Sequence, residues 1–247
     1  MAIILRTGGP VQAGNMFLSS EVLAPEPHNE ADRMTEPLRI DIVSDVMCPW
    51  CVIAHGQLTE ALQATGTEHE IHWHAFELNP EMVPEGEELG AHLQEKYGTT
   101  KEQSEQTRQR MAEVGAEVGV EFSFDEGMRM HNTFNTHQLL HWANEQGRKN
   151  DLKLALFTAH FKDVRNLSDI AVLADIAEEI GLDRDEALAV LEDQRFASEV
   201  RGEETFWIQQ GITGVPAVVF DKKHLVTGAQ GVENYTSILN QLAEASA

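Results

Sequence analysis

Cysteine is scarce in this chain, because only Cys48 and Cys51 among its 247 residues carry a thiol. A structural zinc site takes four ligands, and the sequence has neither a second Cys-x-x-Cys pair nor a Cys/His pattern at finger spacing. We therefore expect no metal site. A structural disulfide across so short a loop would constrain the unfolded chain little. The spacing instead indicates a dithiol that closes and opens with small backbone movements.

Basic residues and long apolar runs are also few. The chain has 18 Lys and Arg against 41 Asp and Glu, a formal net charge of −23. A field of that sign repels nucleic acid and anionic membrane surfaces, and no run reaches the roughly 18 apolar residues of a membrane span. The apolar start, residues 1–5, is too short for a signal peptide. We expect a cytoplasmic protein, in which a Cys-x-x-Cys pair is catalytic or redox-sensing.

Residues 1–36 differ in composition from the rest of the chain. They show no sustained helical or strand period and carry several turn-forming residues: Gly8, Gly9, Pro10, Pro25 and Pro27. We predict that this segment is a disordered N-terminal extension. Residues 37–247 leave ample length for a hydrophobic core.

The cysteine pair lies at the junction between a predicted strand and a predicted helix. Residues 38–43 are rich in β-branched side chains, whereas residues 52–64 have a helical pattern. A sulfur at a helix N-terminus meets unpaired N–H groups and the positive end of the macrodipole. Because the thiolate is the reactive species, this position predicts that Cys48 is a nucleophile at neutral pH.

The remaining pattern predicts one sheet that is interrupted by helices. Residues 70–76 alternate as a second strand, residues 87–210 are almost wholly helical, and residues 217–220 and 224–227 predict two more strands before a last helix. Neither the segment before residues 87–210 nor the segment after them has enough strands to form a stable sheet alone. Together the two segments give a sheet of four strands with helices on both faces.

The fold class that follows is α/β, with a βαβ block and a ββα block in one sheet. We expect residues 37–86 and 211–247 to form this sheet domain together. Residues 87–210 would then be a large all-helical insertion that forms a lid or second lobe.

Four pieces of sequence together resemble the FrnE-like branch of the DsbA family. The pieces are Cys48-Pro49-Trp50-Cys51, Phe76-Glu77-Leu78-Asn79-Pro80, Asn132-Thr133-Phe134-Asn135-Thr136-His137 and Gly211-Ile212-Thr213-Gly214-Val215-Pro216. The resemblance extends from about residue 37 to the C-terminus. It implies a thioredoxin-like fold and a dithiol–disulfide oxidoreductase, with Cys48 as nucleophile, Cys51 as resolving thiol and Pro216 as a cis-proline.

Three further residues are candidates for contacts with substrate. A cis bond before Pro216 would present the Val215 backbone to an incoming chain, while Pro49 and Trp50 would fix the turn and shield the resolving thiol. The expected substrates are proteins that contain disulfides or thiols. We expect no bound cofactor, and exchange of electrons with glutathione or a thioredoxin-type partner. Asp45 could relay protons to the dithiol, but the simpler interpretation is that it accepts hydrogen bonds from nearby N–H groups.

Paired histidines raise the alternative of a metal site. His137 and His141 are four residues apart on one helical face, and His72 and His74 share a strand face. Such pairs can bind zinc, but Gln138 stands where an H-E-x-x-H motif requires glutamate. We prefer two histidines on the buried face of the insertion.

Two other functions compete with dithiol exchange. Hydroxychromene-carboxylate isomerases and kappa-class glutathione transferases resemble this layout, but they typically use a serine in place of the first cysteine. Retention of both Cys48 and Cys51 argues against that glutathione-dependent chemistry. A non-catalytic binding or chaperone module would need exposed apolar surface on the insertion, and the sequence does not show one.

Overall fold

The computed structural model describes residues 16–17, 36–83, 85–124 and 128–246. Most of the extension predicted for residues 1–36 lies outside these ranges, so its disorder stays a prediction. The structure differs at residues 16–17, which form the short strand β1 (Met16–Phe17). This strand runs antiparallel to β7 (His224–Thr227) at one edge of the main sheet.

The two blocks that flank the insertion join in one sheet, as the sequence predicts. Its strand order is β1-β7-β6-β2-β3, where the strands not yet given are β2 (Leu38–Ser44), β3 (His69–Ala75) and β6 (Ala217–Phe220). β2 and β3 are parallel, whereas β6 pairs antiparallel with both β2 and β7. Ile42 in the central strand faces Trp73 on one side and Val218 on the other.

The helices follow the predicted order along the chain. Their bounds are α1 (Pro49–Thr65), α2 (Leu89–Tyr97), α3 (Lys101–Glu117), α4 (Phe134–Glu145), α5 (Lys149–Phe161), α6 (Ile170–Glu179), α7 (Arg184–Asp193), α8 (Ala197–Gln209) and α9 (Val232–Ser246). Helix α1 starts three residues before the predicted 52–64. Proline fits the first helical position because it has no N–H to leave unpaired there, so the Cys-x-x-Cys motif enters the helix.

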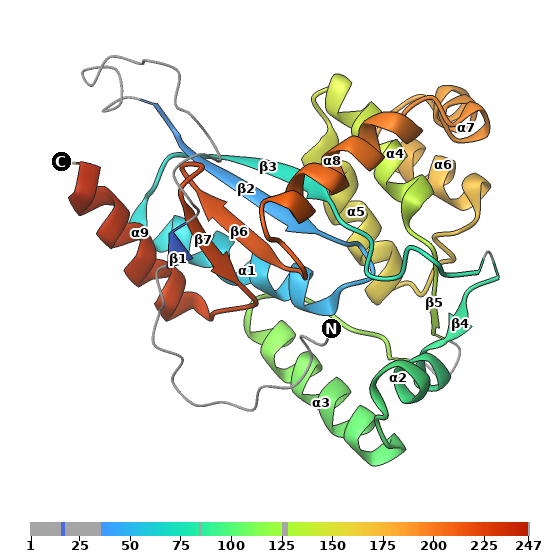
Figure 1. The fold of residues 1–247 in the computed structure, drawn as a ribbon, viewed down its shortest axis with the longest axis horizontal. Coiled ribbons are helices and arrows are strands. Elements are labelled where there is room, and N and C mark those ends of the chain that lie inside the picture. The colour runs from blue at the N-terminus through green and yellow to red at the C-terminus, as the bar shows by residue number, and fades with distance from the viewer. Residues whose placement is uncertain (1–15, 18–35, 84, 125–127, 247) are drawn as a thin grey trace.

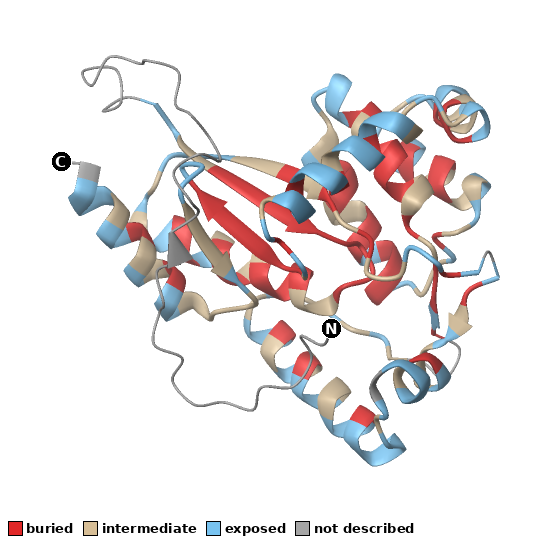
Figure 2. Cartoon of the chain, viewed as in Figure 1, coloured by how far each residue is buried: buried red, intermediate tan, exposed pale blue. Residues whose placement is uncertain are grey.

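Helices cover both faces of the sheet (Figure 1). On one face the His55 ring of α1 lies 5.2 Å from the Trp73 ring of β3, and α9 packs against α1. On the other face His74 of β3 lies 4.7 Å from Trp207 of α8. Between these layers β6 and most of β2 are buried, whereas β7 is half-buried or exposed (Figure 2).

The insertion between β3 and β6 has a hydrophobic core of its own. Helices α4 to α7 bury leucine and other aliphatic side chains among them, including Leu139, Leu152, Leu173 and Val190. The prediction that the insertion is all-helical is wrong at one place. There β4 (Glu87–Glu88) pairs antiparallel with β5 (Arg129–Met130). A strand of two residues is too short to show an alternating pattern. Among the described residues, no helix is both long and apolar enough to cross a membrane.

Candidate active site

The two cysteines lie at the start of α1, directly after the central strand. Cys48 is the N-cap residue, with an extended backbone, and Cys51 lies in the first turn, where its N–H donates to the Cys48 carbonyl oxygen at 3.0 Å. Both thiols are free. Cys48 is 4% exposed and Cys51 is fully buried, so a partner must reach the pair through Cys48.

The turn before β6 lies beside Cys48. β6 pairs with β2, so residues 214–216 reach the end of β2 from which α1 starts. The Val215–Pro216 peptide bond is cis, and Pro216 is buried. The Cys48 Sγ lies 3.7 Å from the Val215 carbonyl oxygen. Cys48 and Val215 are therefore in contact although they are 167 positions apart in the sequence.

Pro49 and Trp50 occupy the positions between the cysteines. Both are half-buried, and Trp50 packs against the core cluster that contains the cysteines. Cys51 itself is fully buried. That Pro49 and Trp50 shield it and contact the substrate stays a prediction.

The two thiols affect each other's pKa in the reduced pair. Burial raises the pKa of the Cys48 thiol, and the hydrogen bond to Cys51 and the charge on Cys51 raise it further. Burial alone would also raise the pKa of Cys51, but hydrogen bonds from Cys48 and Ser44 and the positive charge of Lys153 lower it. The two sulfurs therefore titrate as a pair at the N-terminus of α1, and the nucleophilic role of Cys48 stays a prediction.

Asp45 stabilises the turn that leads into the motif. Its carboxylate is buried and accepts hydrogen bonds from the N–H groups of Met47 at 3.2 Å and Leu78 at 2.7 Å. Burial raises its pKa. These contacts match the interpretation that Asp45 accepts hydrogen bonds from neighbouring N–H groups, and they tie the Cys48 turn to the segment after β3.

The Asn132–His137 piece of the resemblance holds that same segment. The Asn132 side chain donates to the Pro80 carbonyl oxygen at 3.3 Å, and its own oxygen accepts from the N–H of Phe134 at 2.9 Å. The buried His137 ring lies 3.1 Å from the Phe76 carbonyl oxygen through Nε2. The insertion thus positions residues 76–80, and through Leu78 it supports Asp45.

The other histidines do not form the metal site that their spacing allowed. Burial lowers the pKa of His137 to about 3, so it is neutral, while His141 packs its ring 4.8 Å from Phe196. His74 lies between two carboxylates, and His72 lies 3.4 Å from Glu70. Among the residues that the structure describes, no three His, Cys, Asp or Glu side chains are grouped to hold a metal ion.

Sequence reasoning missed Lys153, which is 1% exposed on α5. Its ammonium lies 5.3 Å from the centre of the Trp73 ring and 4.9 Å from that of Phe157. Its positive charge acts on both thiols and on Asp45. The available signal was its position four residues before Phe157, on the stripe that α5 turns toward the sheet.

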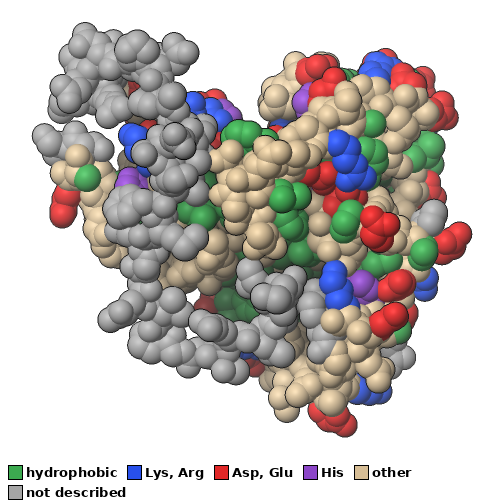
Figure 3. All heavy atoms as spheres, in the orientation of Figure 1, with side chains coloured by type: hydrophobic (Ala, Val, Ile, Leu, Met, Phe, Trp, Pro, Cys, Tyr) green, Lys and Arg blue, Asp and Glu red, His purple; other side chains and the backbone are tan. Residues whose placement is uncertain are grey.

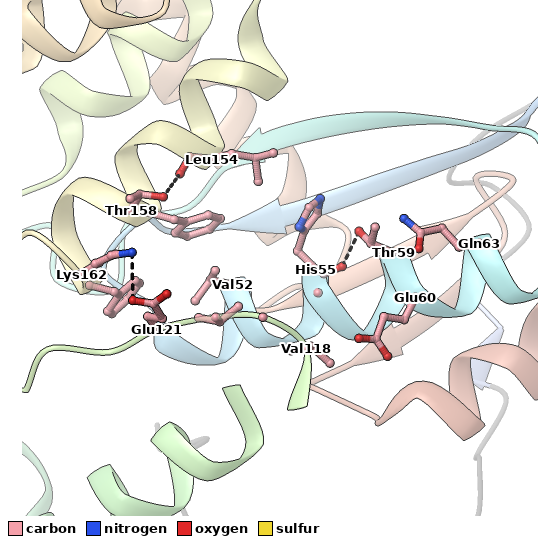
Figure 4. Close-up of a pocket in the computed structure, with 15 residues that line it drawn as sticks. Val52, His55, Thr59, Glu60, Gln63, Val118, Glu121, Leu154, Thr158 and Lys162 are labelled. Carbon is pink, nitrogen blue, oxygen red and sulfur yellow. Dashed lines mark hydrogen bonds and ion pairs between the residues drawn. The ribbon is translucent and has the colours of Figure 1, made fainter. Parts of the chain in front are cut away.

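Two cavities flank α1. One, of about 440 Å³, lies between α1, the segment after α3 and α5; Val52 and His55 line it, and an ion pair between Lys162 and Glu121 crosses its rim at 2.9 Å (Figure 4). Neither thiol is among its lining residues. The other, of about 100 Å³, is lined by Met47 and Pro49, the neighbours of Cys48.

The second cavity is mostly apolar and contains several methionines. Those among its lining residues are Met47, Met111, Met128 and Met130. Methionine is flexible and polarizable, so such a wall adapts to side chains of different shape. Figure 3 shows acidic side chains scattered over the face of the molecule that it displays.

Several known proteins are similar to this chain in sequence or fold. A probable DsbA oxidoreductase from Streptomyces coelicolor is 34% identical, covers 83% of this chain and 89% of its own, and superposes with a TM-score of 0.78. A 2-hydroxychromene-2-carboxylate isomerase, 14% identical with a TM-score of 0.63 over 84% of this chain and 97% of its own, shares the fold. So does the cytosolic disulfide reductase DsbM from Pseudomonas aeruginosa, solved with glutathione, at 16% identity and a TM-score of 0.58 over 84% of this chain and all of its own. Residues 39–240 match the family described as the DSBA-like thioredoxin domain, and the chain belongs to that family.

Proposed function

We propose that this protein is a thiol–disulfide oxidoreductase that acts on protein disulfides through Cys48 and Cys51. The observation that carries the proposal is the placement of the Cys48 sulfur, at the N-terminus of α1 and 3.7 Å from the Val215 carbonyl oxygen. A backbone carbonyl next to a reactive sulfur can pair with an extended peptide. Membership of the family supports oxidoreductase chemistry in general, and the specificity for protein dithiols is our proposal.

The first step of substrate reduction starts from the thiolate of Cys48. When Cys48 loses its proton to water, its sulfur becomes the nucleophile at the helix N-terminus. Its sulfur attacks a substrate disulfide, so a Cys48–substrate S–S bond forms and the substrate S–S bond breaks. The departing substrate sulfur leaves as a thiolate and takes a proton from water.

The second step releases the substrate. Cys51 attacks the Cys48 sulfur, the Cys48–Cys51 bond forms, and the mixed disulfide breaks. The proton of Cys51 ends on the departing substrate sulfur. The substrate has then gained two electrons from the dithiol, one proton from Cys51 and one proton from water, and the same steps in reverse oxidise a substrate dithiol. Thiols of the glutathione or thioredoxin type would reset the pair.

The apolar cavity beside Pro49 supports polypeptide substrates, because its methionine-rich wall would receive side chains that flank the substrate cysteine. We assign the chain to the FrnE-like branch on the Asn-Pro and Asn-x(4)-His pieces, which together support Asp45. DsbM is described as a cytosolic disulfide reductase, and we propose the same compartment for this protein.

A glutathione-dependent isomerase or transferase is the second candidate. The shared fold of the 2-hydroxychromene-2-carboxylate isomerase favours it. That chemistry would need a single nucleophile, and it would leave the buried Cys51 without a role.

The test is the reduction of insulin disulfides and the reactivation of scrambled ribonuclease by the parent, Cys48→Ser and Cys51→Ser. We expect Cys48→Ser to lose both activities, and Cys51→Ser to accumulate mixed disulfides with substrate because nothing resolves them. Full activity of Cys48→Ser would reject the proposal. Glutathione conjugation that survives both substitutions would establish the second candidate instead.

A further inference from the structure

Glu77 and Glu204 are two buried carboxylates that share one guanidinium. The Glu77 side chain is 2% exposed, and that of Glu204 is 9% exposed. Nη1 of Arg201 donates to Oε2 of Glu77 and, at 2.7 Å, to Oε2 of Glu204. The Oε1 atom of each carboxylate is also buried, and it has no hydrogen-bond partner within the described part of the chain. Two carboxylates therefore meet one cation, and one oxygen of each stays unpaired.

This arrangement is costly if both carboxylates are ionised. A buried anionic oxygen without a donor loses its hydration and gains nothing in return, and two like charges beside the same nitrogen repel each other. Arg201 compensates them only in part, because its side chain is 48% exposed and its guanidinium stacks on the Phe134 ring at 3.9 Å. A single proton would remove one of the two charges and supply a donor where none exists, as in other carboxylate pairs that share a proton.

The charged groups around this pair do not relieve the repulsion. Asp45 of the β2–α1 turn and Glu203 of α8 add negative charge. The nearby cations His74 and Lys149 act on Glu203. His137 of α4 is neutral, because burial lowers its pKa to about 3. Arg201 is therefore the cation that the pair itself contacts.

Glu77 belongs to the segment that forms one wall of the second cavity. The next two residues, Leu78 and Asn79, line that cavity. Lys96 of α2 donates to the Leu78 carbonyl oxygen at 3.0 Å and to the Asn79 side-chain oxygen. Arg201 holds Glu77 from α8. Two helices of the insertion thus fix this wall, and the contact from α8 is the one that contains the carboxylate pair.

We propose that Glu77 and Glu204 hold one proton between them near neutral pH, and that this protonated pair positions the cavity wall that receives polypeptide substrates. This inference rests on the proposed function. Loss of the proton adds a second negative charge beside Arg201, and the repulsion loosens the contact between α8 and residues 76–80. The preference for polypeptide substrates over small disulfides is then greatest at low pH and falls as the pH rises.

The pKa values agree with the geometry. Burial raises the pKa of Glu77 to about 7, although the hydrogen bond from Arg201 acts to lower it, and the charge of Glu204 raises it further. Burial also raises the pKa of Glu204. The two groups titrate as a pair, so the midpoint belongs to both.

The direct experiment is an infrared titration of the parent, Glu77→Gln and Glu204→Gln from pH 5.5 to 9. Ionisation removes the carbonyl stretching band of a protonated carboxyl group, and we expect the parent to lose such a band with a midpoint at about pH 7. In each variant the remaining carboxylate has Arg201 to itself and is ionised, so this band is absent. Any band from the buried Asp45 is common to all three proteins.

A kinetic experiment tests the positioning role. The pre-reduced proteins are mixed with insulin or with bis(hydroxyethyl) disulfide, which has no flanking side chains, and the two rate constants of dithiol oxidation are compared from pH 6 to 8.5. Titration of the thiols affects both rate constants alike, so their ratio reports the cavity. We expect the ratio of insulin to small disulfide to fall about fivefold in the parent, the size of a moderate coupling between neighbouring residues.

The two glutamine variants imitate the protonated pair, and we expect both to keep the high ratio at pH 8.5. The matched control is Glu199→Gln, which removes an exposed carboxylate from the same helix and should leave the fall of the parent unchanged. A purely structural role for the pair would lower stability in both variants without making the ratio independent of pH. The pH dependence of insulin itself is common to all four proteins.

The outcomes distinguish the inference from the function on which it rests. If the reduced parent is oxidised by neither disulfide, the proposed function fails, while the infrared titration still shows whether the pair holds a proton. If the parent reacts with both disulfides and lacks the neutral carboxyl band, or if the glutamine variants show the same fall in the ratio, the function stands and the inference is wrong.

Discussion

His74 of β3 lies between two carboxylates. Its Nδ1 lies 2.7 Å from Glu203 of α8 and its Nε2 lies 2.8 Å from Asp41 of β2. Burial alone would lower its pKa, but the hydrogen bonds to Asp41 and Glu203 raise it. Burial alone would raise the pKa of each carboxylate, but His74 lowers it to about 2 together with Arg39 beside Asp41 and with Lys149 and the Ala75 N–H beside Glu203. One imidazolium therefore joins the sheet to the helix on its outer face.

We expect His74→Gln to lower the free energy of unfolding by about 3 kcal/mol at pH 5.5, since it removes the cation between the half-buried Glu203 and the buried Asp41, which keeps Arg39 as a partner. The raised folded pKa sets the pH dependence. The contribution is fully present below the ordinary histidine value of 6.5 and is lost as the pH rises through the folded pKa. Urea unfolding of parent and variant from pH 5.5 to 9 would measure it.

The control for that series is His72→Gln on the same strand. His72 is half-buried and lies 3.4 Å from the exposed Glu70, so we expect a change within about 0.5 kcal/mol at every pH. A His74→Gln effect that stayed constant from pH 5.5 to 9 would contradict an ionised His74.

Single charged residues were also the hardest features to predict from the sequence. A lysine on an amphipathic helix is normally solvated, so Lys153 gave no signal of burial. His74 stood out only as half of a pair with His72, because its partner Glu203 lies 129 positions away. Burial and pairing of charges depend on tertiary packing, which spacing does not contain.

Helix α1 packs closely against the end of α3 at Gly56. A Cβ placed there would lie 2.8 Å from Val118 Cγ2 and 3.2 Å from the Val118 carbonyl oxygen. Valine has little rotamer freedom with which to move away. The glycine therefore permits the contact that holds residues 118–120 against the helix of the reactive pair.

We expect Gly56→Ala to destabilise the protein by about 1 kcal/mol, because overpacking outweighs the gain in helix propensity. Gly202→Ala in α8 is the matched control, since a Cβ there has no neighbour within 4 Å. The control should be stabilised by about 0.8 kcal/mol, the propensity term alone. Thermal or urea unfolding of both variants measures the contrast, and an equal stabilisation of both would show that α3 does not press on α1.

Elements with a clear period were predictable, and those set by pairing alone were not. The bounds of β6 and β7 agree with the sequence pattern to the residue. The edge strand β1 and the β4–β5 pair, each strand two residues long, have no period to read. These short strands form only because each one pairs with a neighbouring strand.

At the scale of the whole molecule, the sequence predicted that the βαβ and ββα segments on either side of the insertion form one sheet. The reason was that neither segment has enough strands to form a stable sheet by itself. The sequence also supported the reactive role of the cysteine pair from its place between strand and helix. The approach of Val215 to Cys48 needed the family resemblance, since only the β2–β6 pairing brings them together. The direction of the pKa shift of Cys51 could be predicted from neither, because it depends on Ser44, Cys48 and Lys153 at once.

The central claim is that Cys48 and Cys51 convert reversibly between dithiol and disulfide. The most direct measurement is mass spectrometry of the parent after equilibration in graded glutathione buffers and thiol alkylation. We predict a single two-electron transition in which both cysteines lose reactivity together, and the reduced protein returns when the ratio is reversed. Cysteines that stay fully alkylated at every ratio, or that react one without the other, would contradict the account.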